Sequence, residues 1–153
     1  MTHKILEEII MSLHRYYFIL LLALLLIPGI SFASDSKYNY ISATDLETRL
    51  TTNLPTNIVD IQVEEEFSQH HIKGAIPTHA YPVKSDADLS KLNATIEQIK
   101  ANTDPVVIVC PRGAGGAKRT YVYLILQGVP AERLLILEKG QSGWTFTPLT
   151  EST

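Results

Sequence analysis

The sequence predicts an α/β domain with a mostly parallel five-stranded sheet and helices on both faces. From Lys37 onward, strand-like and helix-like patterns alternate, as they do in βαβ units, whose right-handed crossovers build parallel sheets. Residues 106–109 are wholly apolar, which is the pattern of a central parallel strand that helices cover on both faces. The chain has 153 residues, enough for one such domain after an apolar N-terminal segment.

The N-terminal segment has the features of a secretory signal peptide. An uninterrupted apolar run covers residues 16–27 directly after a basic residue, and Ser31 and Ala33 place small side chains at the −3 and −1 positions of a cleavage site. A basic flank, a short apolar core and a small-x-small site together define a signal peptide. We therefore expect a signal peptide over residues 1–33 and a folded domain over residues 34–153.

Two alternatives concern this segment. A signal peptide beginning at Met11 would have the usual proportions, so Met11 is the alternative start of the chain. An uncleaved membrane anchor over residues 16–33 is the competing interpretation, although a membrane-spanning helix needs roughly 20 apolar residues. Cleavage is favoured because an anchor does not need the small-x-small pattern. The signal peptide predicts an exported protein, periplasmic or extracellular. Such a protein would contact a membrane only if the N-terminal segment stays uncleaved.

The first half of the domain is expected to hold three strands and two helices. Ser42 is an N-cap candidate, with Asp45 three residues later in the manner of a capping box. Acidic residues in the first turn of the second helix suit the helix dipole. In order, we expect a strand at 38–41, a helix from 42 that ends at 53–55, a strand at 58–61, a helix at 63–71 and a very short strand within 73–77.

The second half is expected to hold two longer helices and two strands. Leu89, Leu92 and Ile96 recur at three- and four-residue spacing, which is typical of an amphipathic helix. Gly128 is a typical cap at a helix C-terminus. We expect helices at 88–101 and 117–127, strands at 106–109 and 134–137, a turn or short helix at 140–144, and a loose polar tail at 147–153.

Cys110 is the only cysteine of the chain and directly follows the central strand. In parallel sheets, ligands bind beyond the carboxyl ends of the strands. A loop of small residues, 111–116, comes next and leads into a helix. Backbone N–H groups and a helix N-terminus aimed at one sulfur favour the thiolate, which is the reactive species. We therefore interpret Cys110 as a nucleophile.

The alternatives for Cys110 are structural or redox roles. A lone cysteine at a strand end often serves as a small buried apolar residue. An odd cysteine in an exported chain can also pair with another molecule or respond to oxidants. The glycine-rich loop that follows it favours a reactive thiol.

Charge and motif content argue against other classes of function. The formal net charge is −3 and no cluster of Lys and Arg occurs, so we expect no binding to nucleic acid. His70 and His71 are adjacent, whereas residues that share one helix face stand three or four positions apart. We therefore expect no metal site, and no motif implies an organic cofactor.

Three segments of the chain resemble signatures of the rhodanese (sulfurtransferase) family. They occur in the family's order and spacing, and they cover nearly all of residues 38–145. The resemblance implies the family's three-layer fold. The segments are Ile58–Gln62 with the later turn His71–Pro77, the strand Val106–Val109 with Cys110 and its loop, and Val129-Pro130 with Leu135–Gly140 and Trp144.

The resemblance also implies the activity of a rhodanese-type sulfurtransferase. Cys110 would attack a sulfane sulfur of thiosulfate, a polysulfide or a persulfide, carry it as a persulfide and pass it to a thiophilic acceptor, which can be a protein. Persulfide formation is covalent catalysis by an activated thiolate. The expected substrate-binding residues are Pro111, Arg112, Gly113, Ala114, Gly115 and Gly116, and the supporting residues are Asp60, Lys118 and Arg119.

The chain departs from the family pattern at several positions. Gln62 stands where the family usually has arginine, and Gly115 where many relatives have a basic residue. Gly116 stands where a phosphatase branch has arginine, which argues against hydrolysis of phosphate esters. Pro111 lacks an N–H and Arg112 is the only cation inside the loop, so polysulfide or a protein-bound persulfide joins thiosulfate as an expected donor. The alternative function is a non-catalytic binding module or a persulfide relay for a partner protein.

Overall fold

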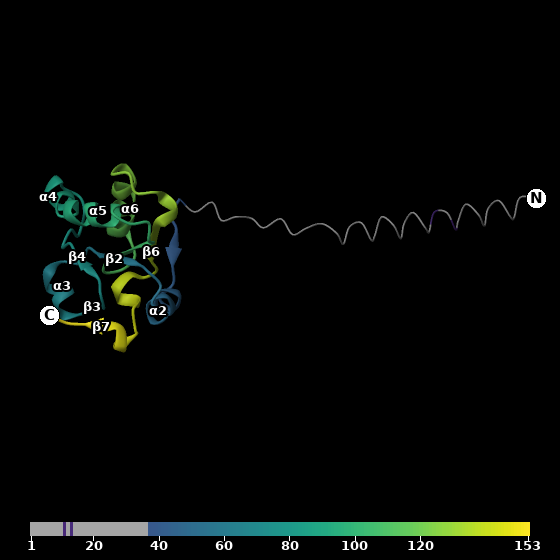
Figure 1. Cartoon of the computed structure of the whole chain (residues 1–153), viewed down its shortest axis with the longest axis horizontal. Coiled ribbons are helices and arrows are strands. Elements are labelled where there is room, and N and C mark those ends of the chain that lie inside the picture. Colours follow the sequence, from purple (N-terminus) through teal and green to yellow (C-terminus); the bar gives the residue numbers. More distant parts are fainter. Residues whose placement is uncertain (1–10, 12, 14–36) are drawn as a thin grey trace, which may run out of the picture. The chain divides into compact units, whose positions relative to one another are not determined.

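Figure 1 shows a computed structural model of the chain, which describes residues 11, 13 and 37–153. Except for Met11 and Leu13, the predicted signal peptide lies outside the described residues, so cleavage and anchoring both stay predictions. Ser36–Thr153 forms one compact unit. In the described part of the chain, every helix is too short or too polar to cross a lipid bilayer.

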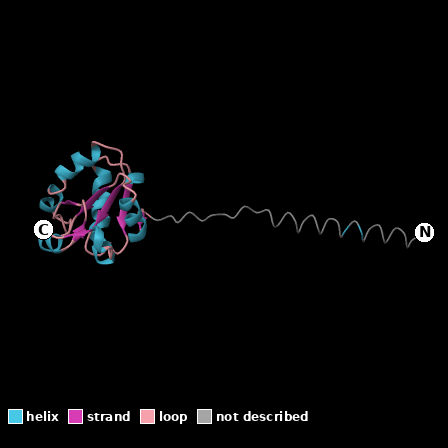
Figure 2. Cartoon of the chain, turned by 60° about the horizontal axis from the view of Figure 1, so that its bottom comes forward, coloured by secondary structure: helices cyan, strands magenta, loops and turns pink. Residues whose placement is uncertain are grey.

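All five strands of the main sheet run parallel, which confirms the predicted fold class. β5 lies at the centre between β6 and β2, and β1 and β4 form the edges. Figure 2 shows the strands in the middle of the domain with helices around them. The strands are β1 (Tyr40–Ile41), β2 (Asn57–Asp60), β4 (Ile76–Pro77), β5 (Val106–Val109) and β6 (Leu134–Leu137).

The helices of residues 37–153 follow the predicted order with one exception. At the first of them, the side chain of Ser42 accepts a hydrogen bond from the N–H of Asp45 at 3.1 Å, as its N-cap pattern predicts. The helices are α2 (Ala43–Thr51), α3 (Glu64–Gln69), α4 (Asp86–Ser90), α5 (Asn93–Lys100) and α6 (Gly115–Leu126), with the 3₁₀ helices η1 (Ala131–Arg133), η2 (Gly140–Gly143) and η3 (Thr147–Leu149).

The residues of β5 alternate between two hydrophobic cores, one on each face of the sheet. Val106 and Ile108 pack in a core with buried residues of α5 and α6. Val107 and Val109 pack in a second core with Leu46 of α2. Successive side chains of a strand point to opposite faces, which is why every β5 position is apolar and none is exposed.

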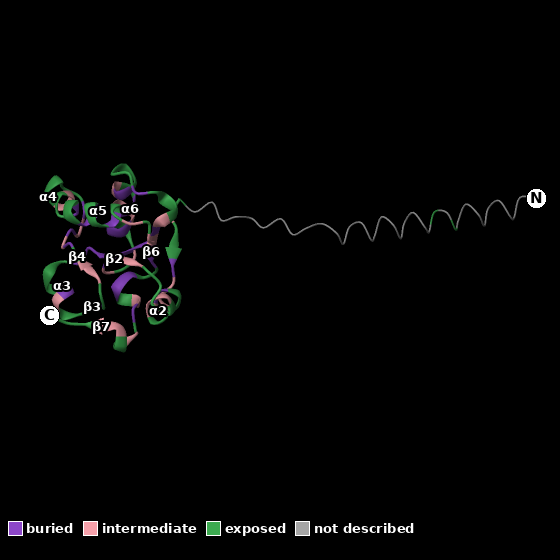
Figure 3. Cartoon of the chain, viewed as in Figure 1, coloured by how far each residue is buried: buried purple, intermediate pink, exposed green. Residues whose placement is uncertain are grey.

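The exception is the single helix predicted at 88–101, which is wrong because the segment forms α4 and α5. α4 begins earlier, at a capping box made by Ser85 and Asp88. Between the two helices, the N–H groups of Lys91 and Leu92 bond to carbonyls three residues back, which is the tighter 3₁₀ pattern. Figure 3 shows α4 at the surface, and none of its residues is buried.

The loose tail predicted at 147–153 is also wrong. This segment forms η3 and then β7 (Thr150–Glu151), which pairs antiparallel with β3 (His71–Ile72). The N–H of Thr153 also donates to the carbonyl of Ser68 at 3.0 Å. Long-range pairing holds these few residues in place, and a stretch this short carries no periodicity that could have predicted it.

Candidate active site

Cys110 lies directly after β5, at the carboxyl edge of the sheet, as its sequence position predicts. Its side chain belongs to the core that α5 and α6 cover, and the residue is only 1% exposed. Across the sheet, Val109 pairs with Asp60 at the end of β2. Cys110 and Asp60 therefore both lie at the edge where parallel sheets bind ligands, with their side chains on opposite faces of the sheet.

The loop after Cys110 offers several backbone donors without an acceptor. Within the described residues, the N–H groups of residues 112–117 donate to no backbone or side-chain oxygen. Three of these residues, 115–117, begin α6, and the first N–H groups of a helix have no partner inside it. Gly113 has a φ of 64°, a left-handed conformation that glycine adopts without steric cost. Unpaired amides at a helix N-terminus are suited to an anion.

The segment Lys139–Ser142 supports this loop from the other side. The N–H of Gln141 donates to the carbonyl of Cys110 at 2.9 Å, and the N–H of Ser142 donates to the carbonyl of Pro111 at 3.0 Å. Gly140 lies flat against the loop, because a Cβ added to it would overlap the carbonyl oxygen of Cys110. The sequence predicts a turn or short helix at 140–144, which η2 confirms, but it does not predict this supporting role. The glycine in the third family-like segment was the signal that could have found it.

Of the three cations expected near the loop, the structure brings Arg119 against it. A Cβ added to Gly115 would lie 3.0 Å from Nη1 of Arg119. The ammonium of Lys118 instead lies 5.4 Å from the ring centroid of Tyr38. Arg112 is exposed on the loop itself. Two guanidinium groups therefore lie at the loop. That of Arg119 is held by hydrogen bonds to backbone carbonyls, and that of Arg112 is exposed on the loop surface.

Asp60 orders the backbone beside the thiol rather than facing a cation. Its carboxylate accepts the backbone N–H of Gln62 at 2.8 Å and the Gln62 Nε2 at 3.1 Å. Both residues are buried. Burial raises the pKa of Asp60 from 3.8 to about 6, although the two hydrogen bonds from Gln62 and the charges of His71 and His79 oppose the rise.

The raised pKa of Asp60 predicts a pH-dependent loss of stability. The folded state binds the proton of the Asp60 carboxyl more tightly than the unfolded state does. Protonation of Asp60 therefore stabilises the folded state fully below pH 3.8, and this stabilisation is lost as the pH rises through about 6. The two pKa values correspond to about 3 kcal/mol in the free energy of unfolding. Asp60→Asn has no charge to lose. Its free energy of unfolding should therefore rise relative to wild type by about 2–3 kcal/mol between about pH 4 and about pH 7.5, measured in urea. A difference that stays constant with pH would contradict this assignment.

His71 is held by contacts with Phe67. Its ring stacks on Phe67 with centroids 3.8 Å apart, and its Nδ1 lies 2.9 Å from the carbonyl oxygen of that residue. In residues 37–153, the structure groups no three His, Cys, Asp or Glu side chains in a way that could hold a metal ion.

Comparison with known families decides what kind of domain this is. A family model described as a rhodanese-like domain matches residues 42–147, which includes the main-sheet strands β2, β4, β5 and β6, the Cys110 loop and the segment that supports it. This chain belongs to the rhodanese-like domain family. Among curated protein sequences, none matches the chain.

Solved rhodanese-like structures share the fold. The rhodanese-like domain of the Alr3790 protein from Anabaena superposes with a TM-score of 0.54 at 18% identity, covering 74% of this chain and 79% of its own. A thiosulfate sulfurtransferase from Pseudomonas aeruginosa superposes with a TM-score of 0.55 at 19% identity, covering 76% of this chain. This rhodanese-like chain spans only 20% of that enzyme.

A third neighbour bears a different name. An As–Sb reductase from Leishmania major superposes with a TM-score of 0.58 at 13% identity, covering 75% of this chain and 86% of its own. At these identities, the likeness shows a shared rhodanese fold only, since one fold supports different chemistries. The function of this rhodanese-like domain must be argued from its own site.

Proposed function

We propose that this rhodanese-like domain is an exported sulfurtransferase that carries a sulfane sulfur as a persulfide on Cys110. The observation that carries the proposal is the position of the thiol. It follows the central strand and is succeeded by a loop whose amides, in residues 112–117, have no acceptor in the described structure. An anionic sulfur is the natural ligand of such a set of donors.

The loading step is a displacement at sulfur. With thiosulfate as donor, the Cys110 thiolate attacks the outer, sulfane sulfur and forms a new S–S bond. The bond between that sulfur and the sulfonate sulfur breaks, and sulfite leaves with its electron pair. The charge is conserved, and no external oxidant or reductant is needed. The product is a persulfide anion on Cys110, a covalent intermediate that divides the transfer into two steps.

The second step returns the thiolate. A thiophilic acceptor, such as cyanide or the thiolate of a protein, attacks the outer sulfur of the persulfide. The S–S bond to Sγ breaks, and Cys110 leaves as the thiolate. Polysulfides and persulfides load Cys110 by the same displacement with a different leaving group. Loop amides that stabilise anionic sulfur assist in both steps, because sulfur at this position is anionic before and after each transfer.

The remaining loop residues have supporting roles in this proposal. Gly113, with its left-handed φ of 64°, allows the loop to turn tightly after Cys110. The exposed guanidinium of Arg112 attracts an anionic donor to the loop. Export rests on the apolar run and the small-x-small site near Ala33, and N-terminal sequencing of the exported protein distinguishes cleavage from anchoring.

Intact-mass spectrometry tests the proposal directly. Reduced protein treated with thiosulfate or polysulfide and then desalted should gain the mass of one sulfur atom, and cyanide should remove it. Because Cys110 is the only cysteine, the added sulfur needs no further mapping. Protein alkylated beforehand with iodoacetamide is the control and should gain nothing. The proposal is wrong if the native protein gains no sulfur from either donor. If Cys110 gains sulfur but does not pass it to cyanide, the result favours the persulfide relay.

A further inference from the structure

Arg119 is held in place by two backbone carbonyls on a loop far from it in sequence. Its Nε lies 3.0 Å from the carbonyl oxygens of both Pro82 and Val83, and its Nη2 lies 2.7 Å from that of Pro82. An arginine is planar and keeps its charge at all accessible pH values. These bonds therefore fix the orientation of a permanent cation on the second turn of α6.

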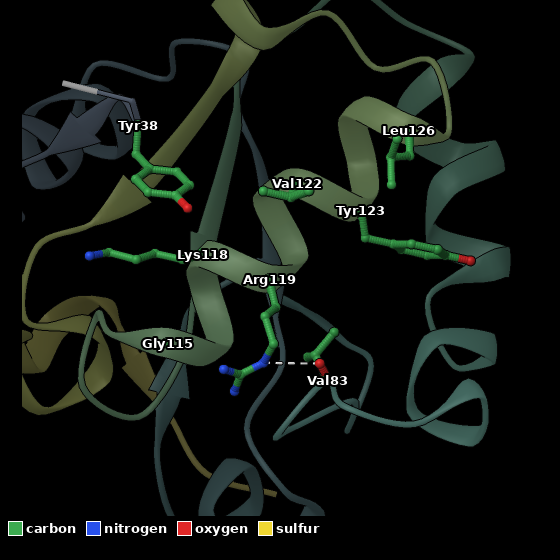
Figure 4. A pocket seen from close by; sticks show the side chains of 8 residues that line it. All are labelled: Tyr38, Val83, Gly115, Lys118, Arg119, Val122, Tyr123 and Leu126. Carbon is green, nitrogen blue, oxygen red and sulfur yellow. Dashed lines mark hydrogen bonds between the residues drawn. The ribbon is translucent and has the colours of Figure 1, made fainter. Parts of the chain in front are cut away.

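The third nitrogen of this guanidinium points toward the thiol loop. Nη1 of Arg119 has no hydrogen-bond partner among the described residues, and it lies 3.0 Å from the place where a Cβ on Gly115 would stand. Figure 4 shows the guanidinium beside the Gly115 end of α6, with its bond to Val83 on the opposite side. A side chain at position 115 would occupy this space. Arg119 can therefore lie against the loop only because residue 115 is a glycine.

The space around this nitrogen is open to a ligand. Gly115, Val83 and Arg119 line one end of a surface cavity of about 450 Å³, which continues along α6 past Val122. A cavity of this size falls within the range that small ligands occupy. No carboxylate among the described residues forms an ion pair with Arg119. A fixed, unneutralised cation at the edge of a cavity is suited to an anionic group.

We propose that Arg119 is the residue that selects anionic donors, by binding the charged end of the donor through Nη1 beside Gly115. This inference rests on the proposed sulfurtransferase function and specifies how its site recognises substrate. The donor's anionic group, such as the sulfonate of thiosulfate, lies between Nη1 and the loop amides, with its sulfane sulfur toward Cys110. The cation that contacts the bound donor thus comes from the second turn of α6 and is positioned by Pro82 and Val83, while Arg112 only attracts the donor from its exposed position on the loop.

Paired alkylating reagents test this assignment without requiring sulfur transfer. Iodoacetate and iodoacetamide are similar in size, both react with the thiolate, and only iodoacetate is an anion. The ratio of their rates at Cys110 therefore cancels the thiolate fraction and reports on the local charge. Arg119→Met should lower the iodoacetate-to-iodoacetamide ratio about fivefold, as expected when a cation that contacts the carboxylate of the bound reagent is removed. It should also raise the KM for thiosulfate more than it lowers kcat.

Three further variants separate charge from structure. Arg119→Lys keeps the charge but not the planar fork and should recover part of the ratio. Gly115→Ala should lower the ratio with Arg119 still present, because its methyl group would press on Nη1. Lys100→Met removes a half-exposed cation at the end of α5 that leads into β5, far from the carboxyl edge of the sheet, and should leave the ratio unchanged.

The outcomes separate this inference from the proposed function. If iodoacetamide alkylates Cys110 normally but Arg119→Met leaves the ratio unchanged, Arg119 does not recognise anions and the inference is overturned. If the ratio falls while thiosulfate and polysulfide add no sulfur, the anion site stands and sulfur transfer is wrong. If neither reagent modifies the native protein and neither thiosulfate nor polysulfide adds sulfur, the thiol is inaccessible and both are overturned.

Discussion

Cys110→Ala is expected to abolish sulfur transfer from thiosulfate to cyanide, to the level of the uncatalysed reaction. No other cysteine can take over, and an alanine methyl group can neither attack sulfur nor leave as an anion. The measurement is the rate of thiocyanate formation by purified wild-type and variant protein at equal concentration. Turnover by Cys110→Ala at more than about one per cent of the wild-type rate would contradict covalent catalysis at this residue.

The stability of two variants separates this loss from misfolding. Cys110 is buried in the core under α5 and α6. Cys110→Ala removes one sulfur atom from that core and should cost about 1 kcal/mol in the free energy of unfolding. Cys110→Ser is expected to cost more, about 1–3 kcal/mol, because it buries a hydroxyl group. Alanine is therefore the cleaner test of function, and urea unfolding of both variants shows whether the fold is retained.

Gly140→Ala is expected to lower the free energy of unfolding by about 3 kcal/mol and to stop sulfur transfer. Gly140 has a φ of 57°, and its added Cβ would overlap the carbonyl oxygen of Cys110 and the amide nitrogen of Gly113. Both contacts are with backbone, which cannot rotate away as a side chain can. The loop must therefore shift from the segment that supports it, and its unpaired amides would change position relative to the thiol. Urea unfolding and the thiocyanate assay measure the two effects.

Gly74→Ala is the matched control for this variant. Gly74 also has a left-handed φ, 79°, but a Cβ added to it would meet nothing within 4 Å. Its substitution therefore carries only the conformational cost, about 1 kcal/mol, and should leave the transfer rate unchanged. If Gly140→Ala is no more destabilising than Gly74→Ala and stays active, Gly140 does not support the loop as described.

The sheet was predictable from the sequence because its strands have strong local patterns. Val106–Val109 is apolar at every position, and it is the central strand with a core on each face. Glycines and a following helix pattern also placed the Cys110 loop at the carboxyl edge. Local composition is sufficient to predict these two features. A strand buried on both faces is apolar at every position, and a tight loop is rich in small residues.

Contacts between distant segments were not predictable in this way. The pairing of β3 with β7 involves two residues on each side, too few for any periodicity. The bonds from Arg119 to the carbonyls of Pro82 and Val83 depend on how the loop between β4 and α4 folds over α6. Arg119 was expected near the loop from its position on the first turns of the helix, but the carbonyls that hold it there have no sequence signature.

The contact between Lys139–Ser142 and the Cys110 loop also bears on how the protein matures. A chain is synthesised from its N-terminus, so the thiol emerges before the residues that fix its loop. β6, the neighbour of β5 in the sheet, also follows the thiol in the sequence. A nascent or truncated chain that stops after α6 therefore holds Cys110 without the hydrogen bond from Gln141. The loop after Cys110 therefore gains its supporting contacts only when residues 127–153 have been made and have folded back onto the sheet.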